Sequence, residues 1–143
     1  MNILITEDEP IQAEELQAIV RDLGHQVLGV AATVRAAMRL AEHAECDLAL
    51  VDVHLRDGAT GPELARRLWQ ENGIVVIFTT SNPDGIPDDF GSACGVLTKP
   101  LSEQSIKSTI RFVKDCMTTG CATRPKPYGL SLSPAYAKRW NVA

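Results

Sequence analysis

Long apolar runs are missing from this sequence, since no stretch approaches the roughly 20 residues of a membrane span, and we expect no membrane association. The first residues have no basic segment and meet an acid at Glu7, which argues against a secretory signal. The four cysteines form no Cys-x-x-Cys pair and no zinc spacing with histidine, so they are expected to be reduced structural thiols. These absences together predict a cytoplasmic protein.

Positive charge and phosphate-binding loops are also scarce. All 18 acidic residues lie at or before Asp115, whereas four of the 14 basic residues follow it. An acidic body argues against a nucleic-acid surface, and four scattered charges make only a weak basic tail. The motifs G-x-x-x-x-G-K-[ST], G-x-G-x-x-G and G-x-S-x-G are absent. The length of 143 residues suits one domain with a short extension.

Short apolar strands alternate with amphipathic helices through most of the chain. Strands are predicted at residues 2–6, 26–31, 48–52, 74–78 and 95–98. Helices with apolar residues at helical spacing follow four of these strands, and the poorest helix candidate is residues 82–93. Its prolines and glycine leave room for two turns at most, around residues 88–92. The alternation predicts an α/β fold with a doubly wound, five-stranded parallel sheet.

Asp52 ends the most apolar of these strands. The unbroken run Leu48–Val51 suits a strand that is buried on both faces. A carboxylate inside such a sheet is costly without charge partners, so Asp52 is expected at the carboxyl end of the strand. Ligands bind at that edge of open parallel sheets. An aspartate that merely caps the next turn is the alternative.

Other polar residues follow the neighbouring strands, namely Glu7 and Asp8 after the first, Thr80 after the fourth and Lys99 after the fifth. These residues and Asp52 are expected to meet at one edge of the sheet. Two carboxylates about 5 Å apart repel by roughly 3 kcal/mol at an effective dielectric constant near 20, so three of them need a cation. Oxygen ligands without cysteine or histidine favour a hard ion, and Mg²⁺ is expected. Asp52 is then either a metal ligand or a nucleophile that forms an acyl phosphate.

Four segments resemble the response-regulator receiver domain of two-component signalling: ILITEDEP at residues 3–10, DLALVDVHLRDG at 47–58, IFTTS at 77–81 and GVLTKP at 95–100. The resemblance covers residues 1–118 and implies the flavodoxin-like strand order 2-1-3-4-5. It also implies a stand-alone receiver that takes a phosphoryl group from a histidine kinase or a histidine phosphotransfer protein. Such a protein is no enzyme beyond catalysing its own phosphorylation and slow dephosphorylation.

The resemblance assigns a role to each residue of the predicted pocket. Asp52 would be the phosphoacceptor and would also bind Mg²⁺, with Asp8 as a direct ligand, Glu7 through water and His54 through its backbone carbonyl. Thr80 and Lys99 would bind the phosphoryl oxygens, and Thr79 is the competing hydroxyl. A cis Lys99-Pro100 peptide is expected. Signals would pass by protein–protein contacts, or the chain would serve as a phosphate shuttle or sink.

Two departures from the family pattern concern signalling. Val96 stands at the switch position, where an aromatic residue is common, and the segment before the fifth strand is short. We therefore expect this protein to signal by another route than the usual rearrangement of residues 82–98. Two further readings stay open. One is an interaction module that is not phosphorylated, and the other is a hydrolase, although His54 stands where that hydrolase would need a second acid.

Residues 119–143 form a C-terminal extension beyond the receiver pattern. They hold Tyr128, Tyr136 and Trp140, whereas free disordered tails are poor in aromatic residues. We expect an arm that docks on its own domain or crosses to a second copy to form a homodimer. A flexible tail is the alternative.

Overall fold

The fold is built on one mostly parallel sheet with helices on both faces. A computed structural model describes residues 1–142. Its sheet order is β2-β1-β3-β4-β5-β6, and the first five strands pair in parallel. Their bounds are Asn2–Thr6 (β1), Gln26–Ala31 (β2), Leu48–Asp52 (β3), Val75–Thr80 (β4) and Gly95–Thr98 (β5). The predicted doubly wound α/β sheet and its order 2-1-3-4-5 are confirmed.

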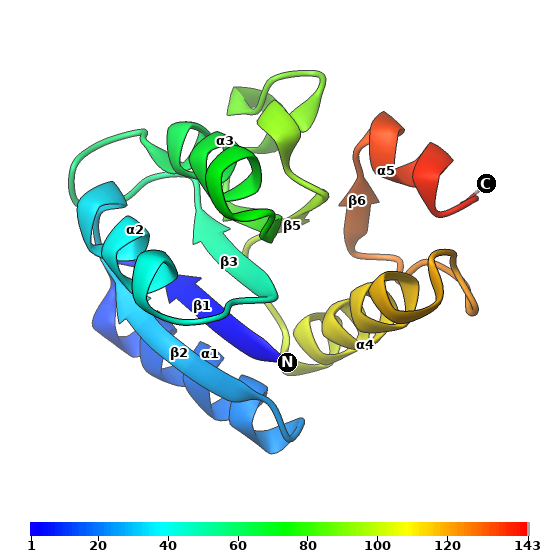
Figure 1. The fold of residues 1–143 in the computed structure, drawn as a ribbon, viewed down its shortest axis with the longest axis horizontal. Helices are drawn as coiled ribbons and strands as arrows, with labels where there is room; N and C mark the ends of the chain where they lie inside the picture. Colours follow the sequence, from blue (N-terminus) through cyan, green and yellow to red (C-terminus); the bar gives the residue numbers. More distant parts are fainter. Residues whose placement is uncertain (143) are drawn as a thin grey trace.

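Four longer helices cover the two faces of the sheet (Figure 1). They are α1 (Pro10–Asp22), α2 (Val34–His43), α3 (Gly61–Asn72) and α4 (Glu103–Thr119). Apolar residues of α1 and α4 share one core cluster, and those of α2 and α3 share the cluster on the opposite face. The side chains of Glu9, Thr33 and Ser102 accept backbone N–H groups at helix starts, which fixes where α1, α2 and α4 begin. Among residues 1–142, no helix is long and apolar enough to cross a membrane.

The segment between β4 and β5 is shorter in helix than expected. Residues 81–94, all described by the structure, contain two 3-10 turns, η1 (Pro83–Gly85) and η2 (Phe90–Ser92), in place of an α-helix. The sequence allowed at most two helical turns around residues 88–92. The structure has one 3-10 turn there, in which Phe90, Gly91 and Ser92 all adopt positive φ, a conformation that an α-helix does not allow. The peptide between Lys99 and Pro100 is cis, as predicted.

The C-terminal extension adds a sixth strand that sequence analysis did not predict. Strand β6 (Leu130–Leu132) pairs antiparallel with β5, and α5 (Pro134–Arg139) follows it (Figure 1). Leu130, Tyr136 and Trp140 are buried in the same core cluster as α4. In this structure the extension therefore packs on its own domain. Its exchange with a second copy remains a prediction.

Candidate functional site

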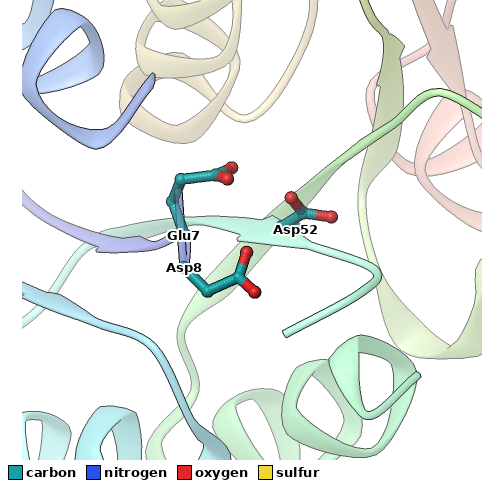
Figure 2. Close-up of side chains that lie close together, drawn as sticks. All are labelled: Glu7, Asp8 and Asp52. Carbon is teal, nitrogen blue, oxygen red and sulfur yellow. The ribbon is translucent and has the colours of Figure 1, made fainter. Parts of the chain in front are cut away.

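Three carboxylates gather at the carboxyl edge of the sheet. Glu7 and Asp8 follow β1, and Asp52 ends the neighbouring β3. One carboxylate oxygen from each residue lies within 4.8 Å of the others. Figure 2 shows the Glu7 and Asp8 side chains extending from the end of β1 toward the side on which Asp52 lies. Glu7 and Asp52 are buried, whereas Asp8 is exposed, so the cluster opens to solvent on the Asp8 side.

An ammonium group joins this cluster from the end of β5. Lys99 Nζ lies 2.7 Å from Asp52 Oδ2 and 3.3 Å from Glu7 Oε2. The Lys99 side chain is 18% exposed, so both ion pairs are largely shielded from water. Backbone also ties this lysine down, because its N–H donates to the carbonyl of Thr80 at 2.7 Å. Residues that are 92 and 47 positions apart in sequence thus meet in one site.

The orientation of Asp52 is fixed by two donors. Its Oδ2 accepts from Lys99, and its Oδ1 accepts from the backbone N–H of His54 at 3.0 Å. The His54 side chain itself is exposed. Glu7 is held in a similar way, because its Oε1 accepts from the backbone N–H of Glu9 at 3.2 Å. These bonds leave the carboxylates pointing toward one another with little freedom to separate.

Burial and mutual repulsion perturb the proton affinities in the cluster. Burial first, and then the hydrogen bond and charge of Asp52, raise the pKa of Glu7 to about 7, against a partial lowering by Lys99. Burial by itself lowers the pKa of Lys99, but the bonds and charges of Asp52 and Glu7 outweigh it, so that pKa is raised. These shifts favour the ammonium form of Lys99 and make the Glu7 carboxyl a weaker acid than an exposed glutamate.

The donor set suits a hard divalent cation. Three carboxylates face one ammonium, so the site carries excess negative charge when all of them are ionised. All the side-chain ligands in the cluster are oxygens, which favour Mg²⁺ over softer ions. The exposed side at Asp8 gives a cation a route into the cluster. The residues thus fit the metal expected from the sequence.

Two threonines compete for the hydroxyl position. Thr79 stands opposite Asp52 in the sheet register, and its carbonyl accepts the N–H of Val53. Thr80 ends β4, and its hydroxyl oxygen accepts the N–H of Asn82 at 3.0 Å. Both side chains are buried. The preference for Thr80 stays a prediction. Val96, which the sequence analysis expects at the switch position, is buried in β5 opposite Ser131 of β6.

Two positions that support the site were not identified as such from the sequence. A Cβ on Gly61 would lie 2.5 Å from Val53 Cα and 2.6 Å from the Asp52 carbonyl oxygen, so α3 starts in contact with the end of β3. Asp57 accepts the N–H of Val34 and the hydroxyl of Thr60, which ties the loop after Asp52 to the start of α2. A glycine just before the helix proline was the sequence signal for the first contact. For the second, the sequence predicted that Asp57 caps or turns the loop with Gly58, but not that it reaches the start of α2.

Comparison with known proteins agrees with the fold. The family model of the response regulator receiver domain matches residues 3–111. The chain is 34% identical over 110 residues to the phyllosphere-induced regulator PhyR of Methylorubrum extorquens, and this alignment covers 76% of this chain and 41% of PhyR. It is 31% identical over 117 residues to PilH of Pseudomonas aeruginosa, and this alignment covers 78% of this chain and 95% of PilH. The chain spans about half the length of the first curated relatives it matches.

A solved receiver domain gives the same result. The receiver domain of PhyR from Erythrobacter litoralis is 29% identical and superposes with a TM-score of 0.68, covering 87% of this chain and 94% of that chain. The family model covers most of the chain, and the observed strand order and the residues at the strand ends are those the resemblance implied. The chain belongs to the family of response regulator receiver domains.

Proposed function

We propose that this chain is a phospho-accepting response regulator of a two-component system, with Asp52 as the phosphoacceptor. The observation that supports it best is the meeting of three carboxylates within 4.8 Å, with the Lys99 ammonium 2.7 Å from Asp52. Asp52, the proposed nucleophile, has the Lys99 ammonium beside it, at a sheet edge that is exposed on the Asp8 side. The phosphoryl donor is a phosphohistidine on a histidine kinase or a histidine phosphotransfer protein.

The proposed step is a phosphoryl transfer between two side chains. An Asp52 carboxylate oxygen forms a bond to phosphorus while the bond from phosphorus to the donor imidazole nitrogen breaks, and the imidazole leaves with that electron pair. The product is an acyl phosphate on Asp52. Lys99 then balances negative charge on the phosphoryl oxygens, and the Thr80 hydroxyl donates a hydrogen bond to one of them.

A bound Mg²⁺ would neutralise the charge that builds up on the transferred group. Asp8, Asp52 and the His54 carbonyl would hold the ion directly, and Glu7 would hold it through water. Slow self-dephosphorylation is the one further reaction that we expect, and the output passes by protein–protein contacts or by onward phosphate transfer.

The test is incubation with acetyl phosphate and Mg²⁺, followed by intact-mass measurement. Wild type should gain one phosphoryl group, and Asp52→Ala should gain none. Asp88→Ala is the matched control, because Asp88 is an exposed aspartate that is not one of the three clustered acids, and it should react like wild type. Omitting Mg²⁺ or adding a chelator should suppress the gain. Equal phosphorylation of wild type and Asp52→Ala would overturn the assignment.

A further inference from the structure

The C-terminal segment 120–142, called the arm below, covers the outer edge of the strand that leads into the site. In the arm, Leu130, Ser131 and Leu132 pair with Leu97, Val96 and Gly95 of β5. The N–H of Ser133 adds a bond of 2.8 Å to the carbonyl of Cys94, just before β5 begins. Lys99 follows the last of these paired residues by two positions. The arm and the Asp52 cluster are therefore joined by one short strand.

Strand β5 and the arm are closely packed at Gly95. A Cβ on Gly95 would lie 2.6 Å from the carbonyl oxygen of Ser131 and 3.0 Å from Leu130 Cδ1. On the other side of β5, Cys94 and Lys99 each donate a backbone bond of 2.7 Å to β4, to Val76 and Thr80 respectively. A displacement of β5 is therefore felt at once by the arm, because close-packed elements transmit small shifts.

Phosphorylation changes what Lys99 must do. In the unmodified chain its ammonium lies 2.7 Å from Asp52 Oδ2. When the acyl phosphate forms, the carboxylate loses its charge and the phosphoryl oxygens carry it, so the ammonium follows the charge to a new place. The Lys99 side chain is mostly covered and its backbone N–H is bonded to Thr80. A shift of the ammonium therefore has to be accompanied by a shift of the backbone at the end of β5.

We propose that arm docking and phosphorylation of Asp52 are coupled through β5, and that phosphorylation loosens the arm. The coupling rests on the proposed function. It makes the arm the output element of a chain that has valine at position 96 and lacks a full helix in residues 82–93. Linkage requires the reverse effect as well: the chain with its arm released must bind a phosphoryl group at the site more tightly than the chain with its arm docked, by the same factor by which phosphorylation favours release.

Hydrogen exchange of the full chain measures the first half of the coupling. Wild type phosphorylated with acetyl phosphate and Mg²⁺ is compared with the same chain in Mg²⁺ alone, and Asp52→Ala is the control. We expect amides of residues 130–142 to exchange at least about fivefold faster after phosphorylation, in wild type only. The two tryptophans, Trp69 and Trp140, have ring centroids 6.1 Å and 5.0 Å from that of Tyr136, so tryptophan emission should change in parallel.

Two variants measure the reverse half with beryllofluoride and Mg²⁺ as the phosphoryl analogue. Gly95→Ala pushes the arm from β5. Arg139→Ala removes an exposed guanidinium whose Cζ lies 5.4 Å from the Trp69 centroid and 4.8 Å from the Tyr136 centroid, so it loosens the arm without altering β5. We expect each variant to speed exchange in residues 130–142 and to bind beryllofluoride more tightly than wild type, with the larger gain in affinity in the variant whose arm is released more often.

The outcomes separate the coupling from the function on which it rests. A chain that is phosphorylated on Asp52 with unchanged or slower exchange in the arm overturns the coupling and leaves the proposed function standing. Variants with a loosened arm and unaltered beryllofluoride affinity overturn it too, as do two variants that fail to loosen the arm. A chain that takes up no phosphoryl group overturns both proposals.

Discussion

Glu7 combines the burial of a core residue with the chemistry of a metal ligand. Its side chain is 2% exposed, and its neighbours are another acid and one shared ammonium. Burial and Asp52 hold its pKa at about 7 when folded, whereas it returns toward 4.5 in the unfolded chain. The folded state therefore binds this proton more tightly. The stability that results is full below about pH 4.5 and is lost as the pH rises through about 7.

The prediction for Glu7 is measured without metal, in a chelating buffer. Relative to Glu7→Gln, the free energy of unfolding of wild type should fall by on the order of 2 kcal/mol between about pH 5 and about pH 8. Urea unfolding at several pH values checks this, and added Mg²⁺ should recover part of the loss. Parallel pH profiles for the two chains would contradict the raised pKa of Glu7.

Single substitutions can also decide which threonine, Thr79 or Thr80, supplies the hydroxyl that binds the phosphoryl group. Thr80→Val and Thr79→Val each remove one buried hydroxyl and keep a branched side chain of similar size. Loss of a donor to developing charge slows transfer, so Thr80→Val should reduce the rate of phosphorylation by acetyl phosphate about tenfold or more. Thr79→Val should stay much closer to wild type. The reverse order of effects would move the role to Thr79, and thermal melts control for folding.

At the scale of elements, the site depends on how closely α3 meets the end of β3. A Cβ at Gly61 would press on backbone atoms of Val53 and Asp52, which cannot turn aside as a side chain can. Gly61→Ala should therefore cost about 2 kcal/mol or more in unfolding free energy and slow phosphorylation. Gly85→Ala is the control, since its nearest neighbour, Asn82 Nδ2, lies 3.8 Å away, and it should change stability by less than about 1 kcal/mol. Equal effects in the two variants would show that the close approach is unimportant.

The order of elements could be predicted because parallel strands that are buried on both faces leave unbroken apolar runs. The site followed, since polar residues directly after such runs must meet at one edge. β6 could not be predicted in this way. The run Leu130–Leu132 is three residues long, and its pairing with β5 is set by contacts distant in sequence. The close contacts at Gly61 and Gly95 could not be predicted in full for a related reason, because a glycine in the sequence does not show which distant backbone approaches it.

The whole molecule closes its core with the arm. Leu130, Tyr136 and Trp140 are buried with residues of α4 and β5, so the extension is part of the folded unit. Trp140→Ala should lower the free energy of unfolding by about 3 kcal/mol, the usual cost of removing a large buried side chain. Chemical denaturation measures it. Tyr128→Ala is the matched control, because Tyr128 lies in the same arm and is fully exposed, and it should change stability by less than about 0.5 kcal/mol. Similar small losses in both would mean that the arm contributes little.

The antiparallel strand β6 also limits the addition of strands from other molecules to the edge of the sheet. Without it, β5 would present an uncharged margin from Gly95 to Thr98, and bare strands of that kind recruit strands from other molecules. With it, the margin is a strand of three residues between Pro127 and Pro134, a poor template for further addition. A protease that clipped the arm would therefore do more than remove an extension: it would create a surface on which fibrous aggregates could begin.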